Sequence, residues 1–272
     1  MANIDTQSEE PAELRQVRIR FASVRAIFAL ILREMSTSYG RSPGGYVWAI
    51  LEPAAGIALL TAIFSAGFRT PPLGTNFPLF YATGVLPFLM YMDITGKMAQ
   101  TLSFSKALLE YPRVTFIDAL AARFILNMLT HFMVHFVIMA WIFIFLDVSV
   151  IMDVDKILLA YAMTLALAFG LGSLNCFLVL AYPIWQTVWA VINRPMFIIS
   201  CLFFLWESVP EPWSNYLWFN PLVHITGLMR DAFFPFYNPN YISPIYVFTF
   251  AAICAIVGLF LLNRYHRDIL DQ

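Results

Sequence analysis

The sequence predicts an all-α integral membrane protein with six transmembrane helices and an amphipathic helix at its amino-terminal end. Of its 272 residues, 60% are hydrophobic and only 12% are charged, which leaves too little polar surface for a soluble protein of this size. Apolar segments close to the roughly 20 residues that a bilayer requires recur along the chain. In the stretch 38–53, a Pro-Gly-Gly break separates a basic segment from the first apolar run. That order is typical of a surface helix that bends into a first span.

The amino-terminal segment, 1–45, is expected to be cytoplasmic and to contain a helix that lies in the membrane interface. Its apolar residues recur at spacings of three and four, as on one face of a helix. They are Leu14, Val17, Phe21, Val24, Phe28, Ile31 and Met35. Arg15, Arg18, Arg25 and Arg33 occupy the other face and the flanks, where their side chains reach the lipid head groups.

The transmembrane domain is predicted over 46–263, followed by a cytoplasmic tail over 264–272. The six predicted spans are 46–68, 77–97, 117–146, 157–182, 186–206 and 244–263. Lys and Arg number six in the amino-terminal segment, three in the loop after the second span and two in the tail, against three in the remaining loops. Because cationic loops stay in the cytoplasm, both termini are predicted to be cytoplasmic.

Two loops are long enough to hold structure of their own. The cytoplasmic loop 100–118 contains a short helix candidate in which Lys106 and Glu110 are four residues apart, although a solvated connector explains it equally well. The external loop 207–243 is rich in proline and aromatic residues. Its amphipathic part, 222–233, is too short to span a bilayer, so we expect a re-entrant or interfacial helix there.

Motifs for catalysis, nucleotide binding or metal binding are missing from the sequence. It has no G-x-x-x-x-G-K-[ST] segment, so we expect no ATP hydrolysis by this chain. His131 and His135 have the spacing of two metal ligands on a helix, but a zinc site requires three or four. We therefore expect packing or interhelical hydrogen bonds from these histidines. The cysteines form no CxxC pair and are predicted to be buried thiols. They are Cys176, Cys201 and Cys254.

Ionisable residues inside the apolar spans are the strongest functional candidates, because such groups are costly in hydrocarbon. Glu52, Arg123 and Arg194 lie at similar depths, so we expect Glu52 to pair with one of the two arginines. This pair could hold the bundle together or contact a substrate. The second predicted span also carries a polar stripe at helical spacing, as a wall facing water or sugar would. The stripe consists of Asp93, Lys97, Gln100 and Thr101.

Several motifs in order resemble one transporter family. They are Tyr39-Gly40-Arg41, 45–49 (GYVWA), Glu52-Pro53, the loop 106–113, 118–123 (DALAAR), 169–172 (FGLG) and 218–224 (WFNPLVH). Together they resemble the permeases of capsular polysaccharide ABC exporters, the KpsM, CtrC and BexB group of the ABC-2 superfamily, over most of the chain. Two features depart from that pattern, namely the tract Asn193-Arg194-Pro195 and the abundance of proline and aromatic residues in the external loop.

The resemblance implies an ABC-2 exporter fold whose subunit dimerises in the bacterial inner membrane and binds two copies of a cytoplasmic ATPase. ATP and Mg²⁺ would then bind to that partner, and this chain would need no cofactor. The cargo would be a lipid-linked capsular polysaccharide, received by a periplasmic co-polymerase or adaptor and an outer-membrane export protein. Contact with the ATPase is expected at the interfacial helix and the loop after the second span. The residues expected there are Arg33, Arg41, Lys106, Glu110, Tyr111 and Arg113.

Two further groups of site residues are expected. The substrate channel would use aromatic faces for sugar C–H patches and charged groups for polar or acidic parts of the cargo. Its residues are Tyr46, Trp48, Glu52, Asp93, Lys97, Gln100, Arg123 and Arg194. An outer gate is expected at Trp213, Trp218, Phe219, His224 and Arg230.

Three alternatives remain open at the level of the sequence. A permease for O-antigen or teichoic-acid polymers would share these features. A membrane-embedded acyl- or glycosyltransferase belongs to another class and would require a catalytic constellation. A membrane scaffold without transport is the third alternative. Co-purification of an ATPase would separate a permease from the last two.

Overall fold

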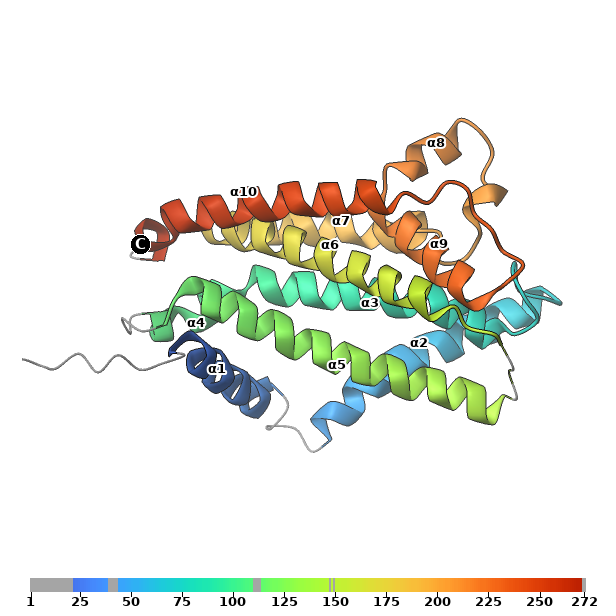
Figure 1. Ribbon diagram of the computed structural model, residues 1–272, viewed down its shortest axis with the longest axis horizontal. Coiled ribbons are helices and arrows are strands. Elements are labelled where there is room, and N and C mark those ends of the chain that lie inside the picture. The colour runs from blue at the N-terminus through green and yellow to red at the C-terminus, as the bar shows by residue number, and fades with distance from the viewer. Residues whose placement is uncertain (1–21, 39–43, 110–113, 147, 149, 271–272) are drawn as a thin grey trace, which may run out of the picture.

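The computed structural model describes residues 22–38, 44–109, 114–146, 148 and 150–270, and these residues form a bundle of helices (Figure 1). The predicted start of the amino-terminal helix, 14–21, lies outside the described residues. The helices are α1 Ala22–Ser38, α2 Gly45–Gly67, α3 Phe77–Ala99, α4 Thr101–Leu109, α5 Phe116–Phe145, α6 Val154–Ala181, α7 Ile184–Ile199, the 3₁₀ helix η1 Trp206–Ser208, α8 Trp213–Trp218, α9 Pro221–Phe233 and α10 Pro244–Leu270.

Five helices are long and apolar enough to cross a membrane: α2, α3, α5, α6 and α10. They match five of the six predicted spans. The remaining prediction, 186–206, corresponds to α7, which has 16 residues and ends at Ile199. The end predicted at Trp206 is wrong, because the chain leaves the helix at Ser200 and Cys201 has a φ of 57°.

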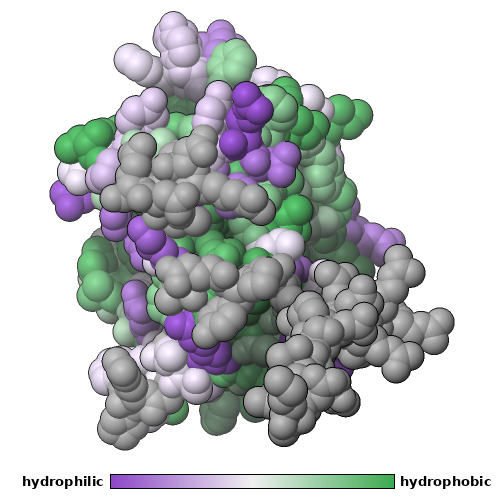
Figure 2. Space-filling model, turned by 90° about the vertical axis from the view of Figure 1, so that its left-hand side faces the viewer, coloured by the Kyte–Doolittle hydropathy of each residue, from purple (hydrophilic) through white to green (hydrophobic). Residues whose placement is uncertain are grey.

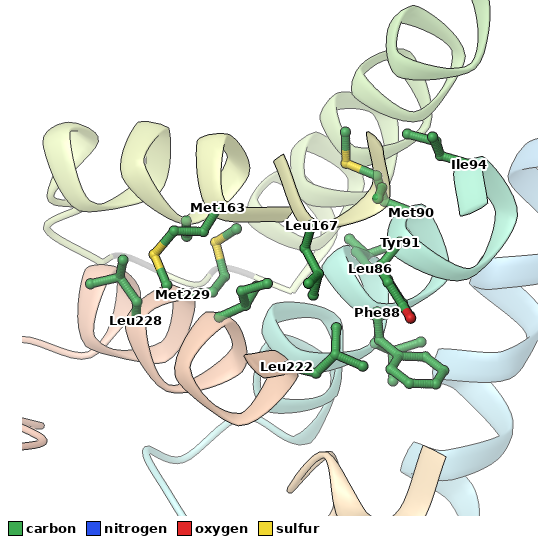
Figure 3. Close-up of a cluster of buried hydrophobic side chains, with 14 of the residues drawn as sticks. Leu86, Phe88, Met90, Tyr91, Ile94, Met163, Leu167, Leu222, Leu228 and Met229 are labelled. Carbon is green, nitrogen blue, oxygen red and sulfur yellow. The ribbon is translucent and has the colours of Figure 1, made fainter. Parts of the chain in front are cut away.

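Helix α3 lies at the centre of the bundle. Within its most apolar stretch 72% of the residues are buried, against 6% for α2. It packs against α2, α5, α6 and α9. Figure 3 shows the resulting core, in which Leu86, Met90 and Ile94 of α3 lie with Leu167 of α6 and Met229 of α9. A central helix of this kind places its polar residues inside the molecule.

Close packing of α6 against α10 depends on small residues. A Cβ atom at Gly170 would overlap the carbonyl oxygen of Ala251 on α10. A Cβ atom at Gly258 would lie 2.5 Å from the backbone nitrogen of Leu174. The α6 and α10 backbones therefore approach each other through both glycines.

The short helices lie at opposite ends of the bundle. Figure 1 places α1, α4 and the carboxyl-terminal end of α10 at one end, and α8 and α9 at the other. Figure 2 views the first of these ends, where hydrophilic side chains lie among hydrophobic ones. The predicted helices at 222–233 and in the loop 100–118 correspond to α9 and α4. Gly44, with a φ of 83°, forms the turn before α2 that the Pro-Gly-Gly break predicted.

Candidate functional site

A cavity of about 630 Å³ lies between α2, α3 and α5. Four of the eight predicted channel residues line it. They are Trp48, Glu52, Asp93 and Lys97. Thr130, His131 and His135 of α5 complete its polar lining, and none of the three had been assigned to the channel.

Helix α2 contributes an aromatic ring and a carboxylate to this cavity. Trp48 and Glu52 are four residues apart and therefore share one face of the helix. Trp48 is 61% exposed and Glu52 is also exposed, so both side chains are accessible to a bound molecule. Gly45, Ala49 and Pro53 of α2 also line the cavity.

The opposite wall is a charged hydrogen-bond network between α3 and α5. The Nζ atom of Lys97 lies 2.8 Å from Oδ2 of Asp93, one helical turn earlier. The same Asp93 oxygen lies 2.9 Å from Nε2 of His131, and Lys97 Nζ donates to Oδ1 of Asn127 at 2.8 Å. About a third of each of the Asp93 and Lys97 side chains is exposed. The wall can therefore both donate and accept hydrogen bonds to a ligand.

His135 makes hydrogen bonds to two neighbouring helices. Its Nε2 atom lies 2.9 Å from the carbonyl oxygen of Leu86, which can only accept, so Nε2 carries the proton. Its Nδ1 atom then accepts from the hydroxyl of Tyr161, also at 2.9 Å. Together with the contact between His131 and Asp93, this confirms the predicted interhelical hydrogen bonds. Within the described parts of the chain, no group of three or more His, Cys, Asp and Glu side chains could hold a metal ion.

Arg123 does not pair with Glu52 as predicted. Its Nε atom lies 2.8 Å from Oε1 of Glu34 on α1, and the two side chains are only 8% and 10% exposed. Its Nη1 atom donates to the carbonyl oxygen of Lys97 at 2.9 Å, and its guanidinium lies 4.4 Å from the ring centroid of Phe104. Sequence reasoning missed Glu34. The available signal was that it is the only acidic residue of α1 and directly precedes Met35 in the apolar stripe.

The other predicted partner, Arg194, is also separated from Glu52. Arg194 lines a second cavity of about 470 Å³ between α3 and α7, together with Gln100, Gln186 and the buried Asn193. Glu52 lines the first cavity, whereas Arg194 lines the second and Arg123 pairs with Glu34. The predicted pairing of Glu52 with either arginine is therefore wrong. The predicted polar stripe of α3 therefore divides between two cavities. Its last member, Thr101, is buried and donates to the carbonyl oxygen of Lys97 at 3.3 Å.

The residues predicted to contact an ATPase are only partly described. Arg41, Glu110, Tyr111 and Arg113 lie outside the described residues. Lys106 is exposed in the last turn of α4. Arg33 is exposed on α1, with its guanidinium 5.7 Å from the ring centroid of Phe104 on α4. Helices α1 and α4 thus present cations at the same end of the bundle. Tyr46, also predicted for the channel, is half-buried near the start of α2.

Comparison with known proteins decides the family. The ABC-2 type transporter family matches residues 25–234. The chain belongs to this family. It is 30% identical to the polysialic acid transport protein KpsM of Escherichia coli, over 90% of this chain and 95% of that protein. It is 26% identical to the capsule polysaccharide export inner-membrane protein CtrC of Neisseria meningitidis serogroup A and 25% identical to BexB of Haemophilus influenzae, over 91% of this chain and 94% of each relative.

In this ABC-2 chain, Arg230 lies inside the protein. It is 1% exposed, and it donates hydrogen bonds to the carbonyl oxygens of Cys201, Leu202 and Phe204 at 2.7, 2.8 and 3.0 Å. Its guanidinium also lies 4.2 Å from the ring centroid of Phe80. These carbonyls would bond to helical N–H groups if α7 continued. Arg230 therefore stabilises the early end of α7, and this burial argues against the direct contact with cargo that an outer gate requires.

Three of the other residues predicted for the outer gate form an aromatic cluster in this ABC-2 chain, in which the Trp218 ring contacts those of Phe219 and His224, whereas Trp213 contacts Tyr216. His224 accepts from the backbone N–H of Ser243 at Nδ1 (3.2 Å), so its Nε2–H donates to the carbonyl oxygen of Trp218 (2.8 Å). Trp213 and Phe219 are each 65% exposed. Trp218 and His224 thus hold the segment between α7 and α10 together, whereas the side chains of Trp213 and Phe219 are exposed and available for contacts.

Nearby, Tyr237 is held in its protonated form. Its hydroxyl donates to the carboxylate of Glu207, with 3.1 Å to each oxygen. Burial, with the neighbouring Tyr241 adding to it, raises the pKa of Tyr237. The hydrogen bond therefore persists over the physiological pH range and ties η1 to the segment after α9.

Proposed function

We propose that this chain is the transmembrane permease subunit of an ATP-driven exporter that moves a lipid-linked capsular polysaccharide across the bacterial inner membrane. The observation that carries the proposal is the cavity between α2, α3 and α5, which brings Trp48, Glu52, Asp93 and Lys97 together inside an ABC-2 bundle. The names of the KpsM, CtrC and BexB relatives support a capsule polysaccharide as cargo.

The chemistry of the cavity suits a saccharide. Sugar rings present apolar C–H patches to an aromatic face such as that of Trp48. Their hydroxyl groups donate to carboxylates, and Glu52 is an exposed carboxylate in this cavity. Lys97 complements it with an ammonium donor, while the ion pair with Asp93 lowers the cost of a charge in this position. The site therefore offers several moderate contacts, which suit a cargo that must also leave.

The proposed topology has six crossings and two cytoplasmic termini. Besides the five long helices, α7 would be the sixth crossing. The irregular segment that Arg230 binds would extend it towards Trp206. Helix α1 and the carboxyl-terminal end of α10 lie at the same end of the bundle (Figure 1). An even number of crossings between them would give this arrangement, whereas five crossings would place them on opposite sides of the membrane. Helix α1 would lie in the cytoplasmic interface, and α9 would be the re-entrant or interfacial helix on the outer side.

The proposed assembly is a homodimer with two cytoplasmic ATPases, which bind ATP and Mg²⁺. Helix α2 supports a second copy or lipid as its neighbour, because only 6% of its most apolar stretch is buried within this chain. The exposed cations Arg33 and Lys106 support an ATPase contact at the α1 and α4 end. A periplasmic co-polymerase or adaptor and an outer-membrane export protein would receive the polymer.

The proposal is tested by deleting the gene and restoring it with variants. Deletion should leave polysaccharide inside the cell, and the restored chain should co-purify with an ATPase. Trp48→Ala and Glu52→Gln should restore normal protein abundance but little surface polysaccharide, because both side chains are exposed and contribute little to folding. Val47→Ala, at an exposed α2 position that does not line the cavity, is the matched control. Normal export by both cavity variants would refute the site, and the absence of internal polymer after deletion would refute the function.

A further inference from the structure

A continuous series of polar contacts joins α1 to the cavity. Glu34 of α1 accepts from Nε of Arg123 on α5 at 2.8 Å. Nη1 of Arg123 donates to the carbonyl oxygen of Lys97 near the end of α3 at 2.9 Å. The ammonium of Lys97 then contacts Asp93 and Asn127, each at 2.8 Å. The contacts link residues that are 89 and 26 positions apart in the sequence, so they connect separate elements of the fold.

The central guanidinium of this series is enclosed on several sides. Arg123 is 7% exposed and Glu34 is equally buried, so little of either side chain is accessible to water. Phe104 of α4 covers the guanidinium at 4.4 Å. A planar guanidinium directs its donors along fixed directions, so one side chain can hold a carboxylate and a carbonyl at once. A lysine ammonium on its flexible stem would not hold the same two groups in this geometry.

We propose that Arg123 is a positioning residue that transmits movement of α1 to the cavity through Glu34 and Lys97. This inference rests on the proposed function, because it assumes that an ATPase moves α1. Displacement of α1 pulls on the carboxylate of Glu34 and thereby on Arg123. The guanidinium then releases or shifts the end of α3, where Lys97 also holds Asp93 at the cavity wall.

A purely structural pair would act differently in one variant. In the exchange Glu34→Arg with Arg123→Glu, an ion pair between α1 and α5 can form again. The carboxylate now on α5 cannot donate to the carbonyl oxygen of Lys97. The exchange therefore restores the attachment of α1 while leaving the connection to α3 broken.

The test measures how accessible the cavity is to a thiol reagent. Ala49 lines the cavity on α2, so a cysteine at this position (Ala49→Cys) reports on access to it. The chain is co-expressed with its ATPase, and the rate of labelling by a small maleimide is compared in inverted membrane vesicles with and without ATP. The parent chain without this substitution measures the background from its three buried cysteines. ATP should change the labelling rate in the parent that carries Ala49→Cys.

Glu34→Gln, Arg123→Lys and the double exchange should each retain the ATPase and hydrolyse ATP, but lose the effect of ATP on labelling. Arg25→Gln, an exposed charge change on the same helix, should retain that effect. An undiminished effect of ATP in the double exchange or in Arg123→Lys would overturn the inference. A parent that exports polysaccharide without any effect of ATP on labelling would also overturn it, while leaving the proposed function intact.

Discussion

The Nη1 atom of Arg230 lies 2.7 Å from the carbonyl oxygen of Cys201, and this contact determines where α7 ends. The φ of 57° at Cys201 turns the chain out of the helix, and the buried guanidinium satisfies the carbonyl groups that the turn releases. The buried charge of Arg230 is thus explained by the backbone carbonyl groups that it binds.

The first prediction concerns this support. Arg230→Ala should lower the thermal stability and abundance of the purified subunit, because each buried carbonyl left without a donor costs about 1–3 kcal/mol. Arg194→Ala is the matched control, since Arg194 is exposed beside the second cavity. Thermal unfolding in detergent measures both, and equal stability of the two variants would contradict the structural role of Arg230.

A second prediction compares Glu34, which pairs with Arg123 in the structure, with Glu52, which the sequence analysis expected to pair with an arginine. Glu34→Ala should strand the buried Arg123 and cost about 3–5 kcal/mol of folding free energy, as breaking a buried pair typically does. Glu52→Ala should have little effect on stability, because Glu52 is exposed in the cavity. Protein abundance and thermal unfolding provide the measurement. A larger loss from Glu52→Ala would restore the original pairing hypothesis.

Packing between α6 and α10 provides the third prediction. Gly170→Ala should destabilise the protein by about 1–3 kcal/mol, because the added methyl group overlaps a backbone carbonyl that cannot rotate away. Gly56→Ala on α2 is the control, since a Cβ atom there has no neighbour within 4 Å. If thermal unfolding shows no difference between these variants, the helices are farther apart than the structure places them.

The fourth prediction concerns orientation and follows from the distribution of Lys and Arg. Single cysteines at Ser8 and Asp271 should resist a membrane-impermeant thiol reagent in intact cells. Cysteines at Asn215 and Asn238, which are exposed in the segments around α8 and after α9, should react once the outer membrane is permeable. Labelling of both termini from outside would reverse the proposed orientation.

The sequence by itself determined the class of this protein, the position of five long helices and the short helix α9. It also carried the motifs by which the ABC-2 family was recognised. These features follow from local properties, because the hydropathy, spacing and residue size of a segment are the same wherever it packs. The polar faces of α2 and α3 were predictable for the same reason, and the structure places Glu52 and Asp93 in one cavity.

Only the tertiary structure decided which charged residues meet. Depth along a span suggested that Glu52 pairs with Arg123 or Arg194, but depth does not specify the direction in which a side chain points. Helix α1 packs on α5 and brings Glu34 to Arg123 across 89 positions of sequence. The sequence also did not show that α7 ends at Ile199, because the apolar run continues past this residue. The hydrogen-bond donors for the carbonyl groups beyond the helix end come from Arg230 on another helix. A hydrogen bond between distant segments depends on how the helices pack, and no pattern within either segment encodes it.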